Sequence, residues 1–198
     1  MAYSDEQRLQ LLEIARKAVG AAARRVPYRP EAPGDEDLRQ MRGAFVTLKE
    51  RGELRGCIGY VEPKYPLYET VARAAAAAAV SDPRFPPVAP YEVDALRLEI
   101  SVLSPMQPVT DVNDIEVGRH GLVVRQGPCS GLLLPQVPGE WGWDREQFLA
   151  HTCLKAGLPT QAWQEGAELF CFEAEVFSEE EMEEQGRPSP GAAPPDRE

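Results

Sequence analysis

The chain has 198 residues, of which 43% are apolar and 27% charged, proportions that are ordinary for a folded domain in water. Its formal net charge is −11, from 21 basic and 32 acidic side chains, and an acidic body repels phosphate backbones. No stripe of lysine and arginine with interleaved aromatic residues is visible, so nucleic-acid binding is disfavoured. The length suits one large domain, or two small lobes that share a core.

Cysteine usage and the amino-terminal residues indicate the compartment. The four cysteines are widely and irregularly spaced, without a Cys-x-x-Cys pair, and neither histidine has metal-site spacing from a cysteine. Free thiols in a reducing compartment are therefore expected rather than disulfides or a zinc site. The first residues are polar, and no window approaches 18 apolar residues, which predicts neither a signal peptide nor a membrane span. We expect a cytoplasmic protein with no metal and no cofactor, since Gly-x-Gly-x-x-Gly and P-loop patterns do not occur.

The first half of the chain predicts two helices and a β-hairpin. Ser4 and Gln7 have capping-box spacing ahead of apolar residues with a helical period. The pair Arg51-Gly52 has the composition of a tight turn between two alternating segments. The predicted elements are a helix over 5–25, strands over 43–49 and 54–61, and an alanine-rich helix from Pro66 to Val80, ended by Pro83.

The second half predicts further strands and one more helix. Asp144 and Gln147 form another capping pair. The predicted elements are a strand over 96–103, a hairpin of 121–126 and 131–137, a helix beginning after Asp144, and a strand over 168–177. Helices interspersed with hairpins favour an α+β fold, which we expect to be a two-lobed single unit with antiparallel or mixed sheets flanked by about three helices.

The carboxyl-terminal residues differ in composition from the rest. A run of glutamates is followed by a segment rich in proline and glycine that has few apolar residues to bury. Such a composition is typical of disorder. We therefore expect a globular domain over 1–182 and a disordered acidic, proline-rich tail over 183–198.

The most unusual segment is Leu54–Gly59. On a strand, Arg55, Cys57 and Gly59 would lie on one face, because side chains alternate. A guanidinium beside a thiol favours the reactive thiolate, and Gly59 would leave open space where a ligand could approach the backbone. Against this stands a structural interpretation, in which Cys57 is a small buried apolar residue and the glycines let a helix pack closely. The sequence leaves both open.

Three charged residues could complete such a site. Asp82 and Arg84 flank Pro83, where they could hold an anionic or amide-bearing ligand or form a surface ion pair that closes a helix end. Glu99 lies in the middle of a predicted strand, where a carboxylate is costly to bury, so it is either solvated or paired in a cleft.

Several segments, in the same order along the chain, resemble one family. They are Leu54-Arg55-Gly56-Cys57-Ile58-Gly59, the segment 81–88 (SDPRFPPV), the segment 98–103 (LEISVL), the segment 131–137 (GLLLPQV), the segment 143–149 (WDREQFL) and the segment 153–158 (CLKAGL). Together they are similar to the AMMECR-domain family, and the resemblance covers about residues 8 to 178. The acidic, proline-rich tail lies outside the family pattern.

The resemblance implies a two-lobed α+β fold with antiparallel sheets and a cleft lined by the Arg-Gly-Cys-Ile-Gly strand. It also implies membership of the prokaryotic AmmeMemoRadiSam set, in which the gene is found beside those of a Memo-like protein and a radical-SAM protein. These two proteins are the partners that the resemblance suggests. It implies no particular reaction.

Two functions are consistent with these residues, and whether the chain is an enzyme stays open. In the first, Cys57 is a nucleophile or redox thiol, Arg55 activates it, and Glu99 or Asp82 assists; no base is evident near Cys57. In the second, which we favour slightly, a non-catalytic module binds a substrate or partner for Memo-like and radical-SAM proteins. The candidate binding residues are Arg55, Gly56, Gly59, Asp82 and Arg84.

Overall fold

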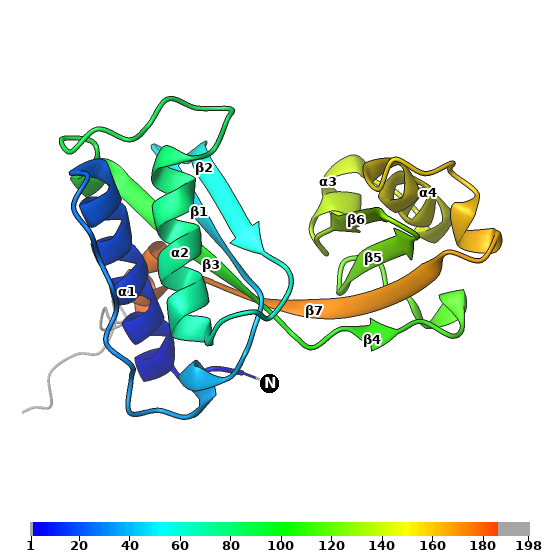
Figure 1. Ribbon diagram of the computed structural model, residues 1–198, viewed down its shortest axis with the longest axis horizontal. Helices are drawn as coiled ribbons and strands as arrows, with labels where there is room; N and C mark the ends of the chain where they lie inside the picture. Colours follow the sequence, from blue (N-terminus) through cyan, green and yellow to red (C-terminus); the bar gives the residue numbers. More distant parts are fainter. Residues whose placement is uncertain (1, 186–198) are drawn as a thin grey trace, which may run out of the picture. The chain divides into compact units, whose positions relative to one another are not determined.

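The computed structural model describes residues 2–185 (Figure 1). In this range the chain forms five α-helices and seven β-strands, and the paired strands described below run antiparallel, which confirms the α+β class. The chain divides into two compact units. Unit 1 comprises residues 2–101 and 176–185, and unit 2 comprises residues 102–175.

Two long helices of unit 1 lie side by side. Helix α1 (Asp5–Ala23) begins with the predicted capping box, in which the Ser4 hydroxyl accepts from the Gln7 amide at 3.3 Å and the Gln7 side chain accepts from the Ser4 amide at 2.8 Å. Helix α2 (Leu67–Val80) begins after Pro66 and ends at Ser81, as the alanine-rich segment predicts. Their facing surfaces are rich in alanine, and small side chains allow close packing.

Three strands form the sheet of unit 1, in which β1 (Ala44–Glu50) lies between β2 (Glu53–Tyr60) and β3 (Leu96–Leu103). The last two residues of β3 belong to unit 2. Helices α1 and α2 cover one face of these strands (Figure 1). The buried side chains on that face are Ala44, Val46, Leu48, Leu96, Leu98 and Ile100. Alternation therefore turns the intervening residues toward the opposite face, which α1 and α2 do not cover and which we call the helix-free face of unit 1.

The predicted β1–β2 hairpin is confirmed. Both central residues of its turn have left-handed backbone conformations, with φ of 53° at Arg51 and 83° at Gly52. Two positive φ angles are what a type I′ turn requires, and this turn matches the twist of the strands that it joins. The turn thereby fixes where the pairing of β1 and β2 begins.

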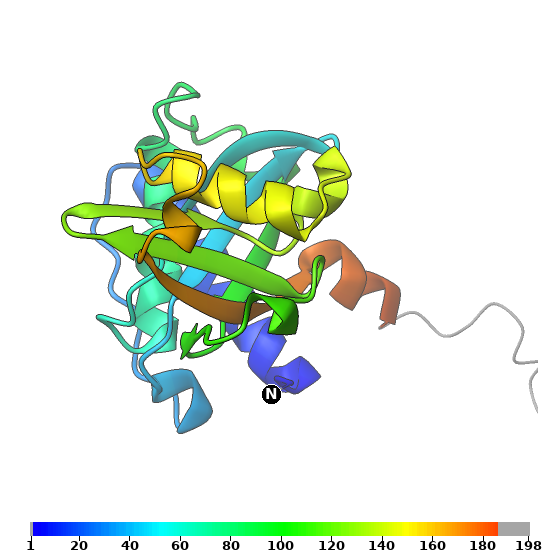
Figure 2. The same ribbon diagram turned by 90° about the vertical axis from the view of Figure 1, so that its right-hand side faces the viewer.

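Unit 2 combines a sheet with one well-packed helix. Strand β7 (Glu168–Ser178) pairs with β4 (Gln107–Pro108) and with β5 (His120–Gln126). Strand β5 also pairs with β6 (Cys129–Leu133). The residues of β7 from 176 onward belong to unit 1. Helix α4 (Arg145–Lys155), drawn in yellow in Figure 2, lies over β5 and β6. The core between them includes Leu122, Val124, Phe148, Leu149 and Cys153.

Two local predictions in unit 2 differ in outcome. Asp144 caps α4 as expected, accepting from the Gln147 amide at 2.8 Å. The strand predicted over 131–137 is too long, since β6 ends at Leu133. Pro135 has no N–H to continue the ladder, and the short helix α3 (Val137–Trp141) follows.

Short 3₁₀ turns occupy Asp37–Arg39, Val93–Ala95, Val112–Asp114 and Ala162–Gln164.

A fifth helix, α5 (Glu179–Gln185), was not predicted. The Arg16 guanidinium pairs with the Glu179 carboxylate, which also accepts from the amide of Leu98 at 3.0 Å, so α5 is held to α1 and β3. The expected tail thus begins with helical residues at 183–185, and its remainder lies outside the described residues. None of the helices described here has the length and apolar content needed to cross a membrane.

Candidate functional site

The position of Cys57 depends on an irregularity in the β1–β2 pairing. Lys49 pairs with Leu54 but Leu48 pairs with Gly56, so Arg55 is an extra residue on β2. Such a β-bulge shifts the register by one residue. Beyond it, Cys57 lies opposite Thr47, a residue that alternates with the buried Val46 and Leu48. Cys57 therefore lies on the helix-free face of unit 1.

Asp82 connects the end of α2 to the middle of β2. Its side chain is only 2% exposed. One carboxylate oxygen accepts from the Cys57 amide at 2.8 Å and from Nη2 of Arg84 at 2.7 Å, and the other accepts from Nε and the amide of Arg84 at 3.0 and 3.1 Å. Nη2 of Arg84 also donates to the Cys57 carbonyl at 3.4 Å. Cys57, Asp82 and Arg84 thus form one hydrogen-bonded network.

The electrostatics of this network favour a permanently charged pair. Hydrogen bonding from the Arg84 guanidinium holds the pKa of Asp82 well below its usual range, and the amides of Cys57 and Arg84 act in the same direction against the effect of burial. The carboxylate in turn raises the pKa of Arg84. Because four donors already occupy the Asp82 oxygens, this carboxylate is positioned to support the strand rather than to exchange protons.

The Cys57 thiol is half-buried and unoxidised. Its sulfur accepts a hydrogen bond from the Thr47 hydroxyl, with an oxygen-to-sulfur distance of 3.2 Å. The thiol thus has a hydrogen-bond partner on the neighbouring strand β1. Thr47 was not identified from the sequence as a site residue, because its place opposite Cys57 follows from the bulge.

Arg55 forms a pair of its own. Its guanidinium binds both carboxylate oxygens of Glu92, at 3.0 and 3.3 Å, and donates to the Pro86 carbonyl at 3.0 Å. The pKa of Glu92 is lowered, first by the Ala89 amide and then by Arg55. The side chains of Arg55 and Glu92 are 12% and 17% exposed. The charge expected to activate Cys57 is thus compensated by a carboxylate, which the sequence did not indicate.

Glu99 is paired, one of the two alternatives that its position in a strand left open. Its carboxylate accepts from the Lys49 ammonium at 2.8 Å, across neighbouring strands β3 and β1. The side chain is 25% exposed, so the pair is partly shielded from water. Lys49 was missed in the sequence, although its alternation with Thr47 along β1 is the signal that places both on one face.

The two glycines of the segment are covered rather than open. A Cβ atom at Gly56 would lie under 3.0 Å from the Ala78 carbonyl oxygen, so Gly56 lets α2 pack directly on β2. A Cβ at Gly59 would come equally close to the Phe45 ring and the Ala44 carbonyl. The expectation of open space beside Gly59 is therefore wrong, because the aromatic ring from β1 fills it. The structural interpretation, in which a helix packs closely, accounts for Gly56, whereas Gly59 is covered by residues of the neighbouring strand β1.

The histidines are the residues that could most readily act as a general base for a thiol. The chain has two histidines, and both belong to unit 2. Nδ1 of His120 accepts from the Glu116 amide at 3.1 Å, and the ring of His151 stacks on Trp143 with centroids 3.9 Å apart. Within residues 2–185, no three histidine, cysteine or acidic side chains are grouped as metal ligands would be. The arrangement around Cys57 can hold a polar ligand through a thiol and a half-exposed guanidinium.

Comparisons with known proteins agree on one family. The AMMECR1 family model matches residues 12–177, a span that includes unit 2 and most of unit 1. Protein MK0488 of Methanopyrus kandleri is 49% identical over 183 residues, covering 87% of this chain and 88% of that protein. Protein NEQ441 of Nanoarchaeum equitans is 41% identical over 180 residues, covering 87% of this chain and all of that protein. The crystal structure of the uncharacterized protein PH0010 from Pyrococcus horikoshii matches with a TM-score of 0.78 and 45% identity, covering 86% of this chain and 90% of that one.

Proposed function

Because the chain belongs to the AMMECR1 family, we propose that it is a non-catalytic binding component. In this proposal, the helix-free face of unit 1 around Cys57 recognises a substrate or partner and presents it to Memo-like and radical-SAM proteins. The two partners are the ones that the family resemblance suggests. The paired charges on this face are the reason that we propose a binding role rather than a catalytic one.

One observation carries the proposal, which is that the charged groups around Cys57 are paired with one another. Arg55 binds Glu92, Arg84 binds Asp82, and Lys49 binds Glu99. An enzyme that uses a thiol nucleophile needs a nearby group that can take up and return a proton. Carboxylates that are held ionised by cations are poorly suited to that task. A pre-formed network of this kind instead supports a rigid recognition surface.

Arg84 is the residue best placed to contact a ligand. Its side chain is 54% exposed, whereas that of its partner Asp82 is 2% exposed. Nε and Nη2 bind Asp82 and Nη2 also reaches the Cys57 carbonyl, which leaves donors of Nη1 for an anionic or amide-bearing group. Asp82 thus orients Arg84, and Cys57 lies beside it.

The test uses the full chain and the Memo-like and radical-SAM proteins encoded beside a prokaryotic homologue. We expect calorimetric titration to detect binding of at least one of them, and Arg84→Gln to weaken it about tenfold, a loss of about 1.4 kcal/mol. Lys17→Gln is the matched control, since it removes one cation that is paired with Glu13 on α1. Absence of binding to both proteins, or equal binding by wild type and Arg84→Gln, would refute the proposal.

Cysteine-dependent acyl, amide or redox chemistry is a second candidate function. The observation that favours it is the half-buried thiol of Cys57 with the Thr47 hydroxyl donating to it. This function requires that Cys57 react while the protein is folded, and that activity disappear in Cys57→Ala. The binding proposal requires neither, so the two functions can be separated experimentally.

A further inference from the structure

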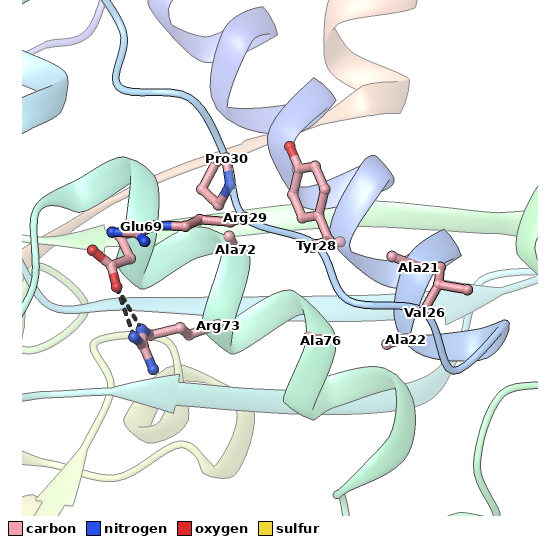
Figure 3. Close-up of a pocket in the computed structure, with 11 residues that line it drawn as sticks. Ala21, Ala22, Val26, Tyr28, Arg29, Pro30, Glu69, Ala72, Arg73 and Ala76 are labelled. Carbon is pink, nitrogen blue, oxygen red and sulfur yellow. Dashed lines mark hydrogen bonds and ion pairs between the residues drawn. The ribbon is translucent and has the colours of Figure 1, made fainter.

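A pocket of about 490 Å³ lies in unit 1 between α1, α2 and the segment 26–30, separate from the helix-free face that carries Cys57 (Figure 3). Sites for small molecules enclose roughly 300 to 1,000 Å³. The pocket is therefore large enough for a ligand of one or two rings.

Small side chains are the reason that this space exists. The surfaces that α1 and α2 turn toward the pocket carry the five alanines Ala18, Ala21, Ala22, Ala72 and Ala76. Residues three or four apart share one face of a helix, and a methyl group fills little of the room between two helices. Pro27 and Pro30 restrict the backbone of the segment that borders the pocket. The floor of the pocket is thus apolar and is built on rigid elements.

The rim is polar and carries an excess of positive charge. Arg73 forms an ion pair with Glu69, in which Nε and Nη2 lie 3.0 and 2.7 Å from one carboxylate oxygen. The Arg73 guanidinium also lies 4.1 Å from the centre of the Tyr65 ring. Arg29, in contrast, has no ion pair or hydrogen bond with any residue in 2–185. Its side chain runs from the 26–30 segment toward the Glu69 end of α2 (Figure 3).

Tyr28 completes the rim. Burial raises the pKa of its phenol, so the hydroxyl stays protonated at neutral pH and can donate a hydrogen bond. Within the described part of the chain the hydroxyl has no hydrogen-bond partner. The ring of Tyr28 borders the pocket, and Arg29 is the charged group of the rim that no residue in 2–185 neutralises.

We propose that this pocket binds a small organic anion with an apolar body. The body rests on the alanine floor, and the carboxylate, sulfonate or phosphate group pairs with Arg29. Charge complementarity supports this occupant, because the protein carries −11 overall yet leaves this guanidinium without a counter-ion among residues 2–185. An apolar ligand without charge would leave Arg29 unused, and a cation would be repelled by it.

The probe for the test is 1-anilinonaphthalene-8-sulfonate, whose fluorescence rises in apolar sites. We expect saturable binding of one equivalent to the folded full chain. N-phenyl-1-naphthylamine, which has the same rings without the sulfonate, is the neutral counterpart. It should bind about five- to tenfold more weakly than the sulfonate, as expected for the loss of one partly solvated charged contact.

Arg29→Gln should weaken binding of the sulfonate about five- to tenfold and leave the neutral probe unchanged. Arg25→Gln is the matched control, because it removes the same charge from the residue just before the 26–30 segment, and Arg25 lines a neighbouring pocket. Equal binding of the sulfonate by wild type and Arg29→Gln overturns the proposal. So does a loss that appears in Arg25→Gln but not in Arg29→Gln, since it would locate the probe in the neighbouring pocket.

Filling the pocket tests its location independently of charge. Ala76→Leu on α2 should abolish binding of both probes, because the larger side chain occupies the floor. Ala21→Leu on α1 provides a second variant if the melting temperature of the first shows that its fold is disturbed. If either variant keeps the wild-type melting temperature and still binds the sulfonate with wild-type affinity, the pocket is not the binding site.

Discussion

The carboxylate of Asp82 lies 2.8 Å from the backbone amide of Cys57, so a side chain two residues beyond the end of α2 holds the centre of β2. The amide can donate outward because β2 pairs with β1 along its other edge. The geometry around the thiol therefore depends on a residue 25 positions away in the sequence. Changes at Asp82 should affect both stability and the site.

Replacing Asp82 with alanine should destabilise the protein by about 2–4 kcal/mol, because the Cys57 amide loses its charged acceptor and a buried cavity remains. Urea unfolding at pH 7 measures the change. Arg84→Gln should cost about 1–3 kcal/mol, because it removes the cation that pairs with the buried Asp82 carboxylate. An Asp82→Ala protein as stable as wild type would show that this hydrogen bond contributes little.

Stability should depend on pH through Asp82. Its pKa in the folded protein is lowered by Arg84, so its contribution is fully present above the unfolded pKa of about 3.9 and is lost as pH falls toward the folded pKa. The difference in unfolding free energy between wild type and Asp82→Asn should be largest near neutral pH and shrink below about pH 4. A difference that grows on acidification would contradict this assignment.

Gly56→Ala should destabilise unit 1 by about 2–4 kcal/mol, because the added methyl group would overlap the Ala78 carbonyl oxygen and force α2 away from β2. The measurement is the melting temperature or the urea midpoint. Gly34→Ala is the matched control, since nothing lies within 4 Å of its added Cβ. If the two substitutions had equal effects, α2 would be able to move away from β2 without a loss of stability.

Iodoacetamide at about pH 7 should modify Cys57 before Cys153 in the folded protein. Cys57 is half-buried, whereas Cys153 is fully buried and burial raises the pKa of its thiol. A labelling time course resolved by peptide mass gives both rates.

The same time course separates the two candidate functions. A catalytic thiol activated by Arg55 predicts that Arg55→Ala slows the alkylation, whereas the Arg55–Glu92 pair predicts an effect mainly on stability. Protection of Cys57 equal to that of Cys153 would exclude a reactive thiol. The binding proposal would then be the one that remains.

Asp144→Ala should cost about 1 kcal/mol, because the side chain caps the first turn of α4. Asp144→Asn should keep most of the stability, since asparagine is also a good N-cap residue. Thermal unfolding of the two variants provides the comparison. Equal stability of wild type and Asp144→Ala would indicate that water replaces the cap at no cost.

Features that depend on local chemistry were predictable from the sequence. The capping boxes at Ser4 and Asp144 and the turn at Arg51-Gly52 are encoded within a few residues, and the structure contains all three. Helix α5 was missed because its glutamates have no apolar period, and its contacts come from Arg16 and Leu98, far away in the sequence.

The site was only partly predictable because a bulge cannot be deduced from alternation. A strict hairpin from the Arg51-Gly52 turn would place Val46 opposite Cys57, on the face that the helices cover. The extra residue Arg55 shifts the register, so Thr47 takes that place. Thr47 could not be recognised as the partner of Cys57 without this shift, nor Glu92 as the partner of Arg55 without the path of the loop after α2.

Unit 1 is interrupted in the sequence, since residues 102–175 separate its first part from the residues 176–185 that complete it. During synthesis on the ribosome, all of unit 2 is therefore translated before Glu179 becomes available to Arg16 and the Leu98 amide. Domains generally fold as they are translated. Unit 2 can therefore fold first, whereas unit 1 can be completed only after residues 176–185 have been synthesised. A nascent chain arrested before residue 179 leaves the Arg16 guanidinium without its carboxylate.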